Sequence, residues 1–148
     1  MTFPLSATGE LDVGGRQDPE QIAQAVYEML SRAPLCSVTR NGLLVEFRGG
    51  FRRFGLTELA AISRGAVEVV IGSASPQLLY TLHFGGFAKV ISACMVPLIL
   101  FILLTRQPQE SISAPMLFLL IGWLWLFGVN YFTTVRRFRL RLRAGLTS

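Results

Sequence analysis

The sequence lacks the short motifs by which many enzymes are recognised. It has no P-loop, no dinucleotide-binding glycine motif, no cysteine pair at CxxC spacing and no HExxH zinc motif. Its acidic residues are scattered along the chain, without a nucleophile or a metal-ligand pattern beside them. We therefore expect no catalytic residues, no metal site and no cofactor, and we predict that the protein is not an enzyme.

Cysteine and histidine are both scarce. Cys36 and Cys94 are the two cysteines, and Cys94 lies inside a long apolar run, so a disulfide between them is not expected. This usage fits a reducing compartment. His83 is the one histidine. A neutral imidazole can bind haem or a chlorophyll-type pigment, but a lone histidine in an alternating segment favours a polar residue on the solvent face of a strand.

Lysine is nearly absent as well, and the positive charge is unevenly placed. Lys89 is the one lysine among 14 basic residues, a usage typical of GC-rich bacterial genomes. The net charge of +5 comes from residues 87–148, because acidic and basic residues nearly balance before them. A nucleic-acid-binding domain needs a basic face on its soluble part. The distribution therefore favours anionic lipid or an acidic partner subunit, and no nucleic acid.

Two long apolar runs dominate the second half of the chain. Residues 87–104 carry a single charge, on Lys89, and residues 116–135 carry none. About 20 apolar residues cross a bilayer as a helix, which satisfies its own backbone hydrogen bonds. We predict a transmembrane helical hairpin over residues 85–135, with its helices at about 86–104 and 116–135. Neither run contains Asp, Glu or His, so an ion path within this chain is not expected.

The flanking charges predict how the hairpin is oriented. Five arginines lie in the basic C-terminal tail, residues 136–148, whereas the loop between the runs has one arginine and one glutamate. The positive-inside rule places the tail, and with it the N-terminal part, in the cytoplasm. The first 15 residues lack the features of a signal peptide. We expect a multi-pass protein of the bacterial inner membrane with both termini cytoplasmic.

Residues 18–84 are predicted to form a small cytoplasmic α+β domain, preceded by a flexible N-terminal arm, residues 1–17. Asp18 and Pro19 are typical of a helix start, and Pro34 ends that helix. Its apolar residues recur at helical spacing, so it is amphipathic and must pack on something.

The rest of this domain is predicted to form a sheet of four or five antiparallel strands, on which the helix packs. Asn41-Gly42 favours a type I′ hairpin turn, and Gly85-Gly86 ties the last strand directly to the first apolar run. We therefore expect the domain to sit against the membrane surface. The segments with strand character are residues 36–40, 43–48, 51–56, 66–71 and 78–84.

Six residues are candidates for contact with a partner or with lipid. Trp123 and Trp125 lie near the middle of the second run and point to different sides of the helix, which favours packing on partner helices, as for Phe127. Lipid exposure, or packing against the first run, is the alternative. Arg136, Arg137 and Arg139 are predicted to bind lipid headgroups or acidic partner loops; alternatively they only set the topology.

These features lead to one functional expectation and one alternative. We expect a non-catalytic accessory or assembly subunit of a larger inner-membrane complex, bioenergetic in kind (respiratory or photosynthetic). It would dock through its hairpin and its cytoplasmic domain, with anionic lipids at the cytoplasmic face and no small-molecule substrate. The alternative is a stand-alone membrane-surface module that binds lipid or a soluble regulator.

Overall fold

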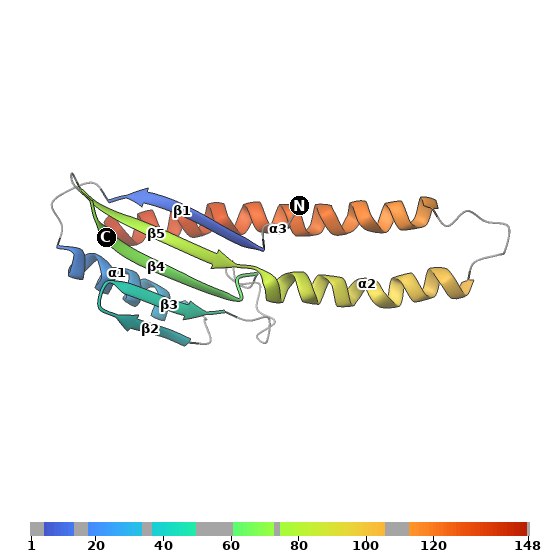
Figure 1. The fold of residues 1–148 in the computed structure, drawn as a ribbon, viewed down its shortest axis with the longest axis horizontal. Helices are drawn as coiled ribbons and strands as arrows, with labels where there is room; N and C mark the ends of the chain where they lie inside the picture. Colours follow the sequence, from blue (N-terminus) through green and yellow to red (C-terminus); the bar gives the residue numbers. More distant parts are fainter. Residues whose placement is uncertain are drawn as a thin grey trace.

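The computed structural model describes residues 5–13, 18–33, 37–49, 61–72, 75–105 and 113–147. It is α+β, as predicted: an antiparallel sheet and a short helix lie at one end, and two long helices form the other end, one of which continues along the sheet (Figure 1). The elements are β1 (Ser6–Asp12), α1 (Pro19–Ser31), β2 (Ser37–Asn41), β3 (Leu44–Arg48), β4 (Arg64–Ile71), β5 (Pro76–His83), α2 (Gly85–Thr105) and α3 (Ser113–Thr147).

The sheet has five strands in the described part of the chain, in the order β1-β5-β4-β3-β2. One edge of the sheet is formed by β1, which was not predicted as a strand. Ser6–Asp12, expected to be part of a flexible arm, pairs along its whole length with β5. Ala7 and Leu11 are buried on the core face, which holds the strand in place. The strand predicted over residues 51–56 lies outside the described residues.

The hairpin between β2 and β3 is present, but its turn is displaced by one residue from the prediction. Asn41 pairs with Leu44, so the loop consists of Gly42 and Leu43. Gly42 has φ +62°, and no other residue in the described part of the chain has a positive φ. A positive φ at the first loop position alone fits a type II′ turn, whereas type I′ needs two.

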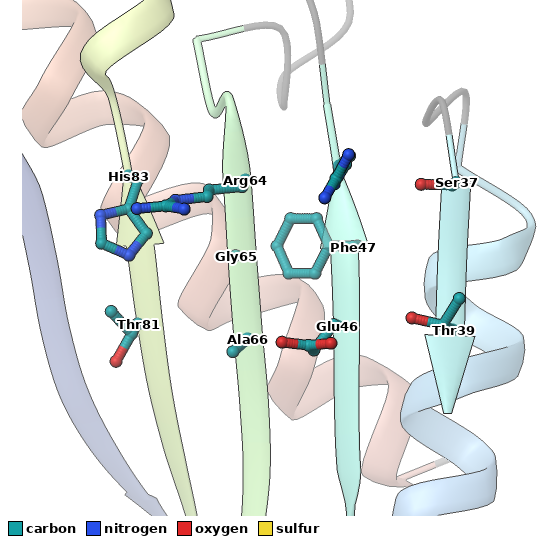
Figure 2. A pocket seen from close by; sticks show the side chains of 10 residues that line it. Ser37, Thr39, Glu46, Phe47, Arg64, Gly65, Ala66, Thr81 and His83 are labelled. Atoms are coloured by element: carbon teal, nitrogen blue, oxygen red, sulfur yellow. The ribbon is translucent and has the colours of Figure 1, made fainter. Parts of the chain in front are cut away.

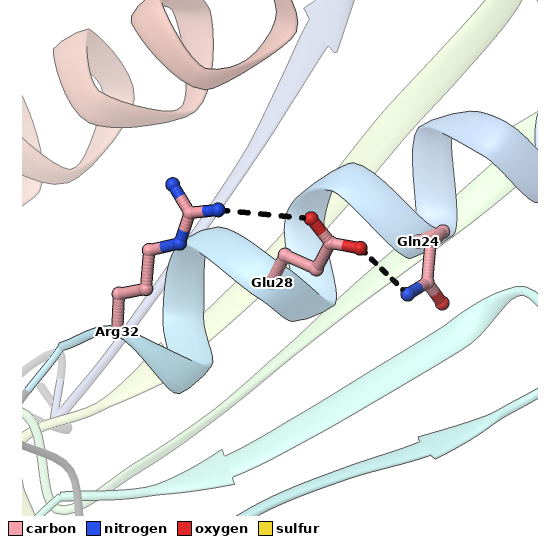
Figure 3. Close-up of polar contacts among 3 residues, drawn as sticks. All are labelled: Gln24, Glu28 and Arg32. Atoms are coloured by element: carbon pink, nitrogen blue, oxygen red, sulfur yellow. Dashed lines mark hydrogen bonds and ion pairs between the residues drawn. The ribbon is translucent and has the colours of Figure 1, made fainter.

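Helix α1 begins and packs as predicted. The Asp18 carboxylate accepts a hydrogen bond from the Glu20 backbone N–H at 3.2 Å, which caps the first turn. Its apolar stripe is buried against the sheet, while Gln24, Glu28 and Arg32 follow one another on the exposed side (Figure 3). Gln24 donates to Glu28 at 2.9 Å and Arg32 pairs with Glu28 at 3.9 Å. Exposed pairs of this kind contribute little to stability.

Helix α3 corrects a second prediction. The second spanning helix was predicted at about 116–135 and the basic C-terminal tail was predicted as a separate segment after it, but α3 continues unbroken to Thr147. Its C-terminal half lies along the sheet and contacts α1 (Figure 1). Phe138 and Leu142 are 0% exposed. A single 13-residue helix cannot cover a five-stranded sheet, and α3 supplies the remaining cover.

An aromatic cluster joins α3 to the sheet. Phe138 packs against Phe47 at 5.7 Å and against Tyr80 at 5.6 Å, measured between ring centroids. Each of these two strand aromatics pairs with a glycine on the next strand, Phe47 with Gly65 and Tyr80 with Gly9. A Cβ on either glycine would overlap the opposing ring. The glycines therefore provide the space in which the rings lie flat on the sheet.

Candidate interaction surfaces

Helices α2 and α3 are both long and apolar enough to cross a membrane. The most apolar windows have mean hydropathies of 2.5 and 1.7, and only 6% of each window is buried within the protein. A core helix of a soluble protein would bury most of its apolar face. In water, so large an exposed apolar surface would be a strong aggregation liability. The two helices are therefore suited to a lipid environment.

Two of the six candidate residues hold α2 and α3 together. Phe127 is only 2% exposed, and its ring stacks on Trp123 at 5.4 Å and on Phe87 at 6.1 Å. The Trp123 indole N–H donates to the Ser92 hydroxyl of α2 at 3.3 Å. Trp123, Phe127 and Tyr131 are four residues apart and share one helix face. The prediction that Phe127 contacts a partner is therefore corrected: its ring is buried inside the chain.

Trp125 points the other way, as predicted, and is 65% exposed. The structure adds two residues that the sequence analysis did not single out. Phe118 and Phe132 are 77% and 73% exposed, and each lies seven residues from Trp125. Seven residues are close to two helical turns, so the three rings lie on one face, turned away from α2.

The same face becomes basic beyond the apolar run. Arg136, Arg139 and Arg143 line a shallow hollow of about 350 Å³, whose remaining walls are apolar. Arg137 is exposed but does not line this hollow. We call the combined stripe the outer face of α3, formed by Phe118, Trp125, Phe132, Arg136, Arg139 and Arg143.

Arg139 also acts on the domain core through its charge. Burial raises the pKa of Tyr80 above its ordinary value of 10.0; Arg139 opposes this rise without cancelling it, and Tyr131 adds to it. Tyr80 belongs to the aromatic cluster that joins α3 to the sheet.

The second surface is the open face of the sheet, opposite α1 and α3. It carries a hollow of about 520 Å³ lined mainly by polar side chains, including Ser37, Arg48, Arg64, Thr81 and His83 (Figure 2). The burial pattern of β5 alternates, with its apolar residues buried and His83 on this open side. This agrees with the predicted solvent-face position for His83.

The strand register sets Ser37, Arg48, Arg64 and His83 side by side in one row across four strands. Figure 2 shows the Arg64 guanidinium extending towards His83. These residues are distant in sequence, and only the pairing of the strands brings them together. We call them the basic row.

Among the residues described in the structure, no group of three or more His, Cys, Asp or Glu side chains is placed to hold a metal ion. The groups exposed on the two surfaces are aromatic rings, guanidinium groups and hydroxyls, together with the Glu46 carboxylate and the His83 imidazole in the sheet hollow. In comparisons with known proteins, no family model, no curated protein and no solved structure matches the chain.

Proposed function

We propose that this protein is a non-catalytic accessory or assembly subunit of a larger membrane complex, and that it docks through the outer face of α3. The hairpin of α2 and α3 crosses the bacterial inner membrane, with the sheet and both termini on the cytoplasmic side. The observation that carries the proposal is the exposed aromatic stripe of α3, which continues directly into an arginine-lined hollow.

The stripe lies deeper than the zone where aromatic residues usually gather in membranes. Phe84 is the residue between β5 and α2, and its ring lies 4.9 Å from the ring of Tyr131, measured between centroids. Tyr131 therefore marks where the sheet meets the hairpin. Trp125 is six residues further in, about 9 Å along the helix. Interfacial belts of Trp and Tyr sit at headgroup level, so Trp125 and Phe118 are better suited to packing on another protein helix.

The arginine end of the face supplies specificity. A guanidinium forms paired hydrogen bonds with a carboxylate, more directionally than an ammonium group does. A partner helix that packs on Trp125 and Phe132 would therefore end in acidic residues opposite Arg136 and Arg139. The unbroken helix α3 fixes the sheet relative to that partner, as a docking subunit requires.

Gentle solubilisation of native membranes tests the proposal. We expect the protein to comigrate with a large complex on a native gel, and its copurifying chains then identify a respiratory or photosynthetic assembly. The double variant Trp125→Ala/Arg139→Gln should release it. The control Leu117→Ala, also exposed on α3, should not. Migration of the wild-type protein as a lone species would contradict the proposal and favour a stand-alone membrane module.

A further inference from the structure

We propose that the basic row on the open face of the sheet binds the headgroups of anionic phospholipids. The sheet itself, and not only α3, then holds the domain on the bilayer. The inference shares with the proposed function only the insertion of the hairpin in a membrane, and it needs no partner subunit.

The row places like charges next to one another. Arg48 and Arg64 are directly paired residues of β3 and β4, and their side chains leave the same face. Directly opposed like charges destabilise an antiparallel pair. In the described residues neither guanidinium forms an ion pair; the salt bridge seen there joins Arg32 to Glu28. An anion from outside the protein would relieve this repulsion.

The row also lies at the level of the membrane surface. His83 is the last residue of β5, and α2 begins only two residues later, at Gly85. Two residues span at most about 7 Å. The headgroup layer on each side of a bilayer is about 5–8 Å thick. If the hydrocarbon begins in the first turns of α2, the basic row falls among the phosphates.

The remainder of the open face has the opposite character. Glu46 lies one step beyond the row and lines the same hollow as the arginines. Glu68 and Glu10 lie one step further, and all three point to the same side of the sheet. An anionic surface attracts the basic end of this face and repels the acidic end. The charge gradient therefore orients the sheet with its arginines towards the bilayer.

The hollow offers the groups that a phosphate diester needs. Arginine binds phosphate oxygens through paired, charge-assisted hydrogen bonds. The hydroxyls of Ser37, Thr39 and Thr81 line the same hollow and can donate to the remaining oxygens. Continuity with the spanning helix favours a lipid headgroup over a free anion, because the lipid is held at this depth at high local concentration.

The test uses the full-length protein in nanodiscs that contain phosphatidylcholine and phosphatidylglycerol, with retained lipids counted by native mass spectrometry. We expect the wild type to prefer phosphatidylglycerol, and Arg48→Gln/Arg64→Gln to lower that preference by about fivefold for each arginine. Arg32→Gln, at the exposed arginine that follows α1 as its C-cap, is the matched control and should change nothing. Unchanged circular dichroism of the double variant confirms its fold.

Two results would overturn the inference. One is a double variant that retains the wild-type preference, or loses no more of it than Arg32→Gln does. The other is millimolar inorganic phosphate abolishing the preference as fully as the double substitution, which would show a free-anion site. Neither result depends on comigration with a complex, so this inference and the proposed function fail separately.

Discussion

The ring of Phe138 in α3 stacks on the ring of Phe47 in β3, with centroids 5.7 Å apart and planes inclined by 28°. This contact joins the helix that begins in the apolar hairpin to the core face of the sheet. The hairpin and the domain therefore share one hydrophobic core, and α3 belongs to both. A substitution in the C-terminal half of α3 should therefore change the stability of the sheet.

Phe138→Ala should destabilise the domain by about 3–5 kcal/mol, the usual cost of removing a buried aromatic ring. The free energy of unfolding can be measured by urea denaturation in detergent, followed by far-ultraviolet circular dichroism. Leu140→Ala, two residues away and exposed, should stay within about 0.5 kcal/mol of the wild type. Equal effects of the two variants would place the core elsewhere.

Gly65→Val should also destabilise the domain, by about 1–3 kcal/mol, because the new side chain would displace the Phe47 ring from its place over the strand. The neighbouring substitution Ala66→Val is the control. Its side chain leaves the open face of the same strand, where a β-branched residue is well tolerated. A larger loss for Ala66→Val would contradict the assigned faces of β4.

Thr133→Pro tests whether α3 is continuous between its two halves. Thr133 is exposed and lies between the apolar run and Phe138. Proline removes the hydrogen bond to the carbonyl of Val129 and should cost about 3 kcal/mol. Amide hydrogen exchange beyond residue 134 should then accelerate, while Thr133→Ala leaves it unchanged. Equal protection in both variants would argue for a break already present in the wild type.

The pKa of Tyr80 predicts how stability depends on pH. Its pKa is raised in the folded protein, chiefly by burial, so the unfolded chain loses the phenol proton first as pH rises. The stabilisation is complete below pH 10.0 and is lost as pH rises above that value towards the higher folded pKa. Tyr80→Phe should flatten this alkaline loss in thermal melts. An equally steep loss in the variant would assign it to another group.

The helix cap, the alternating strands and the two apolar helices could be predicted because each has a local signal. Strand β1 could not, because Gly9 interrupts its apolar alternation, and only Tyr80 on the neighbouring strand explains that glycine. In α3, Phe138, Leu140 and Leu142 alternate like a strand and also fit a helix. The helix buries Phe138 and Leu142 and leaves Leu140 exposed.

The interaction surfaces, too, could be predicted from the sequence only in part. The seven-residue spacing of Phe118, Trp125 and Phe132 is visible in the sequence, but which face of α3 is covered depends on where α2 packs. The basic row depends wholly on strand register, since Arg48 and Arg64 are brought together only by the pairing of β3 with β4. No local pattern around either residue indicates this contact.

Photocrosslinking in native membranes tests the central claim most directly. The probe p-benzoylphenylalanine is placed at Phe118 and at Trp125 on the outer face of α3, and at the exposed neighbours Leu117 and Leu124 as controls. Each control is one residue earlier and about 100° around the helix. We predict strong adducts with another membrane protein from positions 118 and 125 and weak ones from 117 and 124. Adducts with lipid alone at 118 and 125, or equal protein adducts from both pairs, would contradict docking through this face.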